Sequence, residues 1–216
     1  MKKRIFVTAT NTDIGKTYTT KLLLQEFAKR GLLVGVIKPI ETGVIDGYAA
    51  DGEALLETLK QLNPKLWSLD VEDIVPITYE LPAAPFVASH NTPLDREKIE
   101  KTLQEMEQVC DVVIIEGAGG LYVPVDAETM MIDLIQFFDA KALLVTHCSL
   151  GCINDTILSQ KALEAKQIDF VTAFNCREND ASFAQISEPY FIHSKQKVLK
   201  VDRDIDIICD LLYNLS

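Results

Sequence analysis

A Gly-Lys-Thr triplet at residues 15–17 is the clearest chemical signal in the sequence. It stands between a predicted strand and a predicted helix, and such a junction suits a polyphosphate. The Gly15 backbone can approach the ligand closely, the Lys16 ammonium can face the outer phosphates, and the Thr17 hydroxyl can bind Mg²⁺. The first amides of the helix and its dipole add to the attraction. Thr10 replaces the first glycine of the strict Walker pattern, but the placement still favours a phosphate-binding loop over a surface turn.

Lys38 and Asp51 are candidate partners of this loop. Lys38 follows a predicted strand, residues 33–37, so its ammonium could place a second cation over the phosphates. Taken alone, Lys38 is better explained as a solvated lysine at a strand end. Asp51 begins a predicted helix, where sequence alone favours an N-cap. The alternative for Asp51 is a Mg²⁺ ligand.

A third candidate lies at the end of the apolar strand predicted over residues 112–115. Glu116 occupies the place of the acid in a Walker B site, and a carboxylate at the end of a buried strand is costly without a nearby cation. Thr17, Asp51 and Glu116 could therefore give oxygen ligands to one Mg²⁺. The glycine-rich residues 117–120 favour close approach of the backbone to a ligand, with a plain tight turn as the alternative.

Two later strand ends could bind other parts of a ligand. Residues 149–154 join a predicted strand to a helix, and their free amides suit a small anion such as a carboxylate. Ordinary capping by Ser149 or Asn154 explains that segment equally well. Asn175 ends the strand predicted over residues 168–174, and its side-chain amide could hydrogen-bond a nucleobase.

Short β-branched runs alternate with helical patterns along the chain, which predicts an α/β fold with a mostly parallel sheet and helices on both faces. Ligands of such sheets bind at the carboxyl ends of the strands, where the candidate residues lie. The predicted strands are residues 4–8, 33–37, 74–79, 112–115, 142–146, 168–174 and 198–201, and the predicted helices are residues 16–30, 51–62, 95–109, 153–166 and 205–215. Because the chain has 216 residues and no linker, residues 1–216 are expected to form a single domain.

The composition limits the partners of the protein. Acidic residues number 32 and basic residues 21, so the formal charge is −11, which disfavours nucleic acid and anionic membranes. No apolar run reaches the roughly eighteen residues of a membrane span, and no signal peptide is recognisable, so we expect a cytoplasmic protein. The five cysteines contain no Cys-x-x-Cys pair and are expected to be reduced thiols.

In this order, the motifs resemble those of the dethiobiotin synthetases. The resemblance spans residues 3–176 and rests most specifically on Glu-Gly-Ala-Gly-Gly at 116–120 and Leu-Gly-Cys-Ile-Asn at 150–154. It implies a homodimeric enzyme of the P-loop NTPase type that needs Mg²⁺ and consumes ATP. Such an enzyme converts 7,8-diaminononanoate and CO₂ into dethiobiotin, a step of biotin biosynthesis. The implied intermediates are a carbamate and its mixed anhydride with phosphate.

The same resemblance implies a role for each motif residue. Lys38, Lys16 and Thr12 would be the catalytic residues. The nucleotide would be bound by Asp13, Ile14, Gly15, Lys16, Thr17, Asp51, Glu116, Gly117, Ala118, Gly119, Asn175 and Cys176. Mg²⁺ would be held by Thr17, Asp51 and Glu116. The diamine would be bound by Thr12, Lys38, Thr42 and Gly119, and its carboxylate by the second subunit through Gly151, Cys152, Ile153 and Asn154.

Two positions depart from the pattern of the family. The phosphate loop begins with Ala9 where glycine is usual, and residues 197–201 lack the Gly-x-x-Pro turn that commonly reads adenine. We therefore expect weak selectivity for the nucleobase.

Two other P-loop classes share some of these motifs. A cobyrinate-type amidating ligase would carry a glutaminase domain, for which 216 residues leave no room. A partitioning or cell-division ATPase would have a lysine at position 11, where this chain has asparagine, and a membrane-targeting tail. Both classes are therefore less favoured than the synthetase.

Overall fold

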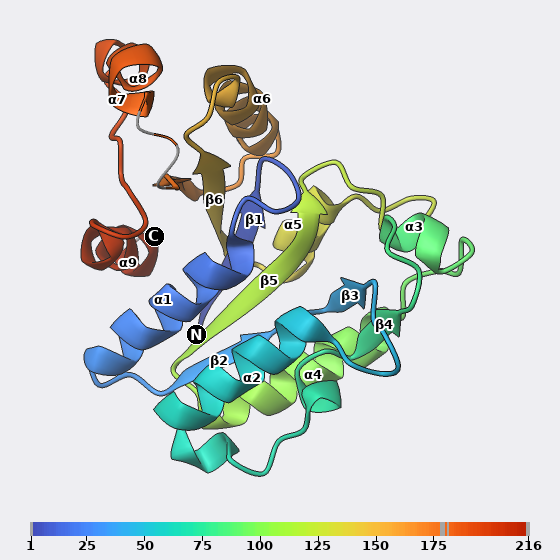
Figure 1. Ribbon diagram of the computed structural model, residues 1–216. Helices are drawn as coiled ribbons and strands as arrows, with labels where there is room; N and C mark the ends of the chain where they lie inside the picture. Colours follow the sequence, from blue (N-terminus) through green and yellow to red (C-terminus); the bar gives the residue numbers. More distant parts are fainter. Residues whose placement is uncertain (1, 178–179, 181, 215–216) are drawn as a thin grey trace.

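A parallel sheet forms the centre of the computed structural model, which describes residues 2–177, 180 and 182–214 (Figure 1). Within this part of the chain the sheet has five strands, in the order β2-β5-β1-β6-β7. They are β1 (Lys3–Ala9), β2 (Val34–Ile37), β5 (Val112–Gly120), β6 (Lys141–His147) and β7 (Phe170–Asn175). Their central residues are buried and apolar, because helices cover both faces of the sheet. The predicted fold class is therefore confirmed.

The helices that cover the sheet lie in two layers, one on each face (Figure 1). One layer consists of α1 (Lys16–Lys29), α2 (Ala50–Leu62) and α9 (Ile205–Asn214). The other consists of α4 (Arg96–Val109), α5 (Met131–Phe137) and α6 (Cys152–Ala165). The chain moves from β1 out to β2 through α1 and then returns across the sheet through the second layer. Right-handed crossovers in opposite directions put the two sets of helices on opposite faces.

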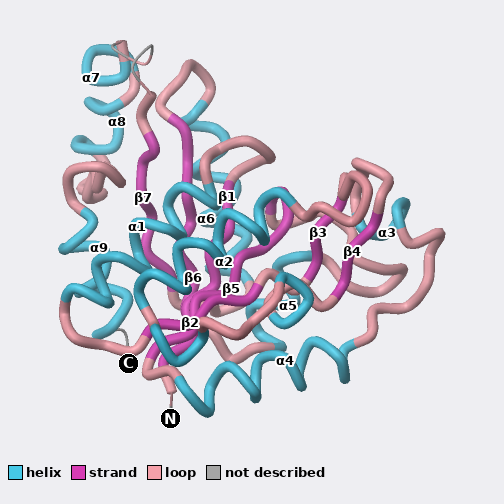
Figure 2. The backbone as a smooth tube through the Cα atoms, turned by 60° about the horizontal axis from the view of Figure 1, so that its bottom comes forward, coloured by secondary structure: helices cyan, strands magenta, loops and turns pink. Residues whose placement is uncertain are grey.

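Two smaller groups of elements flank this core. β3 (Ile40–Thr42) and β4 (Ile77–Tyr79) form a separate parallel ribbon, with α3 (Pro85–Ala88) beside it (Figure 2). At the opposite side, α7 (Phe183–Ile186) and α8 (Glu188–His193) follow β7. The short 3₁₀ turns Pro64–Leu66 and Val71–Asp73 connect α2 to β4. The ribbon extends the carboxyl edge of the sheet next to the phosphate loop.

The structure corrects the predicted ends of some strands. The strand predicted over residues 198–201 is a single parallel bridge between Lys200 and Phe174. The strand predicted over residues 74–79 is reduced to β4, and β3 lies in a segment for which no strand was predicted. β5 does not end at Ile115 but continues through the glycines, because β1 offers it a partner as far as Gly120. The last residue of the helix predicted over 205–215 lies outside the described residues.

A disulfide joins Cys148 and Cys176, so the expectation that all the cysteines are reduced thiols is wrong for this structure. The parallel register pairs His147 with Asn175, and the next residue of each strand therefore leaves the sheet beside the other. The two Cα atoms lie 4.9 Å apart, a separation that a disulfide can span. The remaining cysteines are buried free thiols: Cys110, Cys152 and Cys209.

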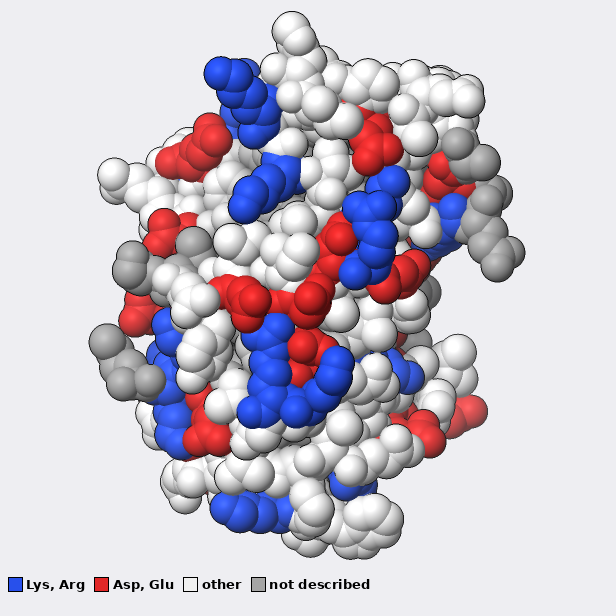
Figure 3. Space-filling view, turned by 90° about the vertical axis from the view of Figure 1, so that its left-hand side faces the viewer, with Lys and Arg blue, Asp and Glu red and all other residues white. Residues whose placement is uncertain are grey.

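Two observations describe the charge of one face and the length of the helices. On the face shown in Figure 3, Lys and Arg side chains lie interspersed with Asp and Glu and do not gather into one basic patch. Among the described helices, none has both the length and the apolar character needed to cross a bilayer.

Candidate functional site

A cleft of about 670 Å³ opens at the carboxyl edge of the sheet, between the phosphate loop, β3 and the start of α2. Ten of the residues that line it are site residues named from the sequence: Thr12, Asp13, Gly15, Lys16, Thr17, Lys38, Thr42, Asp51, Ala118 and Gly119. Two lining residues, Glu41 and Arg177, were not named. The cleft thus brings together residues that are far apart in the chain.

Gly15 has two structural reasons to be glycine. Its φ of +99° lies in the left-handed region, where a side chain is strained. A Cβ at this position would also lie 2.1 Å from the Asn175 side-chain nitrogen. That nitrogen donates a hydrogen bond of 2.7 Å to the Ile14 carbonyl, so the end of β7 is tied to the phosphate loop. The Asn175 amide oxygen is the atom that could accept a hydrogen bond from a nucleobase.

Lys16 points into the cleft and is largely buried, with 8% of its surface exposed. Its Nζ donates to the Asn11 carbonyl at 3.3 Å. Burial lowers the pKa of Lys16, and the charge of Glu116 opposes that effect. A desolvated ammonium with one carbonyl partner is a strong site for a phosphate anion.

The ammonium of Lys38 bridges two carboxylates. Its Nζ lies 2.6 Å from Asp51 Oδ2 and 2.8 Å from Glu116 Oε1, and the Thr17 hydroxyl donates to the same Glu116 oxygen at 2.9 Å. Lys38 is 3% exposed and Glu116 is fully buried. Burial disfavours the charged form of Lys38, but the charges of Glu116 and then Asp51 outweigh it and raise the pKa of Lys38. Lys38 is therefore a buried, paired cation and not a solvated one.

Asp51 does not cap its helix, so the N-cap interpretation is wrong. Ala49 occupies the N-cap position of α2, and the Asp51 carboxylate turns toward Lys38. Burial disfavours ionisation of Asp51, but the charge of Lys38 is stronger and lowers the pKa of Asp51 below its usual value.

Glu41, at 6% exposure, caps α2 in place of Asp51. Its two carboxylate oxygens accept hydrogen bonds of 2.9 Å from the backbone amides of Asp51 and Gly52. Burial raises the pKa of Glu41. The sequence contained an indirect signal: Ala49 has no side chain that can cap, and the first amides of a helix need an acceptor from elsewhere. This contact orients the first turn of α2, and with it the Asp51 carboxylate.

The residues proposed for Mg²⁺ fit that ion. Thr17, Asp51 and Glu116 present a hydroxyl and carboxylate oxygens, which are the ligands that Mg²⁺ prefers. Glu116 Oε2 is buried and lacks a hydrogen-bond partner among the described residues, so one carboxylate oxygen is unused. In the same part of the chain, no three His, Cys, Asp or Glu side chains gather into a metal site. Water and phosphate oxygens would have to complete the coordination.

The glycine-rich segment after Glu116 is the end of β5, so the tight-turn alternative is wrong. A Cβ on Gly117 would lie 2.7 Å from the ring of Phe6, and a Cβ on Gly119 would lie 2.6 Å from the Val123 side chain. Packing therefore excludes larger residues at both positions. Of this segment, Ala118 and Gly119 line the cleft.

Comparisons with known proteins identify the family. Residues 3–206 match a family model described as an AAA domain. The chain is 45% identical over 187 residues to an ATP-dependent dethiobiotin synthetase of Sulfurovum, covering 87% of this chain and 89% of that protein. It is 38% identical to the Helicobacter pylori enzyme of that name, covering 86% and 87%, and 35% identical to the Wolinella succinogenes enzyme, covering 97% and 98%. This chain belongs to the dethiobiotin synthetase family. It is therefore an enzyme of the ligase class.

Solved structures of other proteins share the fold of this synthetase. A plasmid partition protein of Borrelia burgdorferi has a TM-score of 0.60 at 11% identity, covering 99% of each chain. The Aquifex aeolicus MinC:MinD cell division complex has a TM-score of 0.52 at 18% identity, covering 91% of this chain and 79% of that one. At these identities the likeness concerns the fold alone.

Five site residues expected of a dethiobiotin synthetase lie away from the cleft in this chain. Residues 151–154 form the junction into α6, where Gly151 has a φ of +99°. The Asn154 amide donates to Asp155, and Cys152 is buried against the aromatic cluster of Phe174. Cys176 has its sulfur in the disulfide, so only its backbone is available to a nucleotide.

Proposed function

We propose that this chain, as a single domain of residues 1–216, catalyses the ATP- and Mg²⁺-dependent conversion of 7,8-diaminononanoate and CO₂ into dethiobiotin, ADP and phosphate. The observation that carries the proposal is the pair of buried cations, Lys16 and Lys38, which line one cleft with Thr17. The fully buried Glu116 contacts both Lys38 and Thr17. Membership of the dethiobiotin synthetase family supplies the substrate class.

The chemistry explains why two lysines are needed. One amine of the diamine attacks CO₂ and loses a proton, which gives a carbamate. A carbamate oxygen attacks the γ-phosphorus, and the bond to ADP breaks. The second amine then attacks the carbonyl carbon, and phosphate leaves as the ring closes. Because carbamate and triphosphate are both anions, their contact requires cations, and Lys16 and Lys38 stabilise the charge on the transferring phosphoryl group.

Thr17, Asp51 and Glu116 would hold Mg²⁺ beside the phosphates. The ion supplies Lewis-acid stabilisation of charge on the phosphate oxygens. Asp13, Ile14, Gly15 and the amides at the start of α1 wrap the phosphate chain. Asn175 presents its amide oxygen to the base.

The diamine would lie on the open side of the cleft, against Thr12, Thr42 and Gly119. We propose that a second subunit binds its carboxylate through the amides of residues 151–154. Exposed apolar side chains support a dimer near that segment: Leu150 is 86% exposed and Leu158 on α6 is 60% exposed. ATP is a cytoplasmic metabolite, so we place the reaction in the cytoplasm.

The test is phosphate release by the purified protein with Mg-ATP. Release should require both diaminononanoate and bicarbonate, and mass spectrometry should detect dethiobiotin as the product. Lys38→Gln is the control for contaminating activity, because it should lower kcat far more than it weakens ATP binding. Phosphate release that ignores the diamine would contradict the proposed function.

A further inference from the structure

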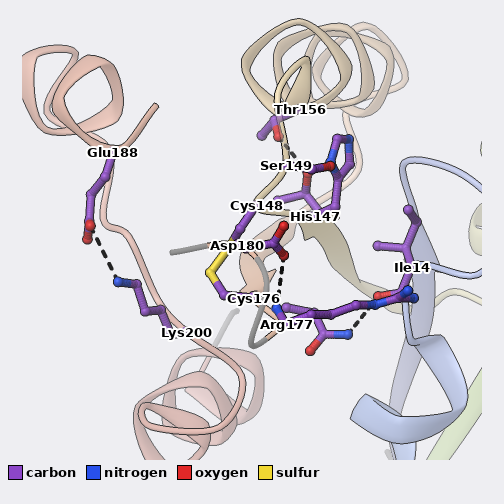
Figure 4. Close-up of a disulfide and its surroundings, with 12 residues drawn as sticks. Ile14, His147, Cys148, Ser149, Thr156, Cys176, Arg177, Asp180, Glu188 and Lys200 are labelled. Atoms are coloured by element: carbon purple, nitrogen blue, oxygen red, sulfur yellow. Dashed lines mark hydrogen bonds and ion pairs between the residues drawn. A yellow bond between two sulfur atoms is a disulfide. The ribbon is translucent and has the colours of Figure 1, made fainter. Parts of the chain in front are cut away.

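Arg177 is a cation at the cleft to which the sequence motifs assign no role. It follows Asn175 and Cys176 at the end of β7, and its side chain crosses to the phosphate loop. There a guanidinium nitrogen donates a hydrogen bond to the Asp13 carbonyl. Figure 4 shows Arg177 extending from the disulfide-bonded Cys176 toward the loop at Ile14. Arg177 thus joins Lys16 and Lys38 on the wall of the same 670 Å³ cleft.

The backbone of Arg177 is held on both sides. The preceding residue is tied to β6 through the disulfide, and the Arg177 amide donates a hydrogen bond of 2.9 Å to the Asp180 carboxylate. The guanidinium therefore starts from an anchored point beside the loop. Anchoring reduces the entropy that the long side chain must lose when it binds a ligand.

The Arg177 guanidinium lies beside the phosphate loop without a charged partner in the part of the chain that the structure describes. No described carboxylate forms an ion pair with it, and its partner on the loop is a neutral carbonyl. A guanidinium carries five N–H donors in a planar fork that matches phosphate oxygens. The loop that it touches is the one whose amides would wrap a phosphate chain.

We propose that Arg177 binds the phosphate chain of the nucleotide, as a third cation opposite Lys16 and Lys38. This inference rests on the proposed nucleotide site. It assigns to Arg177 a contact with phosphate and not with the base. Loss of Arg177 would therefore weaken the binding of every nucleoside triphosphate, and of a polyphosphate without a base, by the same factor.

A purely structural role is the competing explanation. In that case Arg177 only holds the phosphate loop in place through its hydrogen bond to the Asp13 carbonyl. Two variants separate these roles. Arg177→Gln keeps an N–H donor for the carbonyl but has no charge, whereas Arg177→Lys keeps the charge. Lys101→Ala is the matched control, because it removes one positive charge from the exposed surface of α4, where Lys101 is paired only loosely with Glu105 at 3.8 Å.

The experiment measures dissociation constants of Mg-ATP, Mg-GTP and Mg-tripolyphosphate by calorimetry, with thermal melts to compare the fold of each variant. If Arg177 makes a charge-assisted hydrogen bond of ordinary strength, Arg177→Gln should raise the dissociation constants of all three ligands by about 10- to 100-fold. Arg177→Lys should lose less than about fivefold, and Lys101→Ala should match the unmodified protein.

Three results would overturn the proposal. One is unchanged tripolyphosphate affinity in Arg177→Gln beside weakened ATP, which would indicate a base contact. Another is a ligand affinity that Arg177→Gln retains and Arg177→Lys loses, which would indicate that Arg177 only holds the loop through the Asp13 carbonyl. The third is unchanged affinity for all three ligands in Arg177→Gln. Failure of the unmodified protein to bind Mg-ATP would instead contradict the proposed function on which the inference rests.

Discussion

Removing the Lys38 ammonium should destabilise the whole protein, because it leaves a buried carboxylate without its cation. Glu116 is fully buried and lies 2.8 Å from Lys38 Nζ, and Lys38 itself is 3% exposed. Breaking a buried ion pair by removing one partner costs about 3–5 kcal/mol. Asp51 adds little to this figure, because its side chain is 49% exposed and water screens it. Lys38→Met should therefore lower the free energy of unfolding by about 3–5 kcal/mol, or Tm by roughly 6–20 °C.

Urea unfolding without nucleotide or Mg²⁺ measures this loss. The double variant Lys38→Met/Glu116→Gln should recover most of it, because no buried charge remains unpaired. Lys101→Met is the control, since Lys101 and Glu105 form an exposed pair whose loss should cost less than about 0.5 kcal/mol. The reasoning is refuted if Lys38→Met costs no more than that control, or if the two single substitutions add in the double variant.

The pH dependence of the same pair has a definite sign. The folded state raises the pKa of Lys38 above its ordinary value of 10.5. The stabilisation is therefore fully present below pH 10.5 and is lost as the pH rises through the higher pKa of the folded state. The difference in unfolding free energy between the unmodified protein and Lys38→Met should be constant through the neutral range and decrease only in strong alkali.

Four further predictions concern the cleft and its edge. Asp51→Asn should raise the Mg²⁺ concentration for half-maximal activity by about tenfold or more, and an unchanged Mg²⁺ titration would remove Asp51 from the metal site. Gly15→Ala should cost stability and also reduce Mg-ATP affinity by at least about tenfold, because its Cβ would displace the Asn175 amide. Gly47→Ala is the control, because Gly47 also has a positive φ, of +80°, but no atom lies within 4 Å of its new Cβ. This variant should cost only the backbone strain of about 1–2 kcal/mol. Equal Mg-ATP affinities in the two variants would contradict the predicted contact between the Gly15→Ala Cβ and Asn175. Thiol titration of the denatured chain should count three thiols before reduction and five after it, and reduction should lower the free energy of unfolding by about 2–4 kcal/mol; five thiols from the start would exclude the disulfide. Because residues 197–201 carry no Gly-x-x-Pro turn, kcat/KM for ATP, GTP and CTP should agree within about a hundredfold, or ~2.7 kcal/mol, and a stronger preference for ATP would show that other residues form a complete adenine site.

Some of the cleft could be predicted because its signals are local in the sequence. The Gly-Lys-Thr triplet stands at a strand–helix junction, and a run of β-branched residues places Glu116 at a buried strand end. Parallel strands then bring their carboxyl ends to one edge whatever their order in the sheet. Placement of Lys16, Lys38 and Glu116 near one another follows from that rule alone.

The short elements could not be predicted in the same way. α5 spans seven residues and α3 four, which is too short to establish a helical period. The glycines at the end of β5 carry no strand signal, yet this segment is a strand because β1 continues beside it. In both cases packing decides against local preference.

The sequence by itself determined which groups this protein can use and the family it belongs to: an α/β fold, a phosphate-loop motif with its lysine, and a second lysine and an acid at strand ends. Only the tertiary structure decided how those groups are paired. Glu41 caps the helix that Asp51 was expected to cap, Cys148 meets Cys176, and Arg177 reaches Asp13. Each of these contacts joins residues that no local period relates. They depend on the order of strands in the sheet and on where each chain segment leaves it, and both are set by packing across the whole molecule.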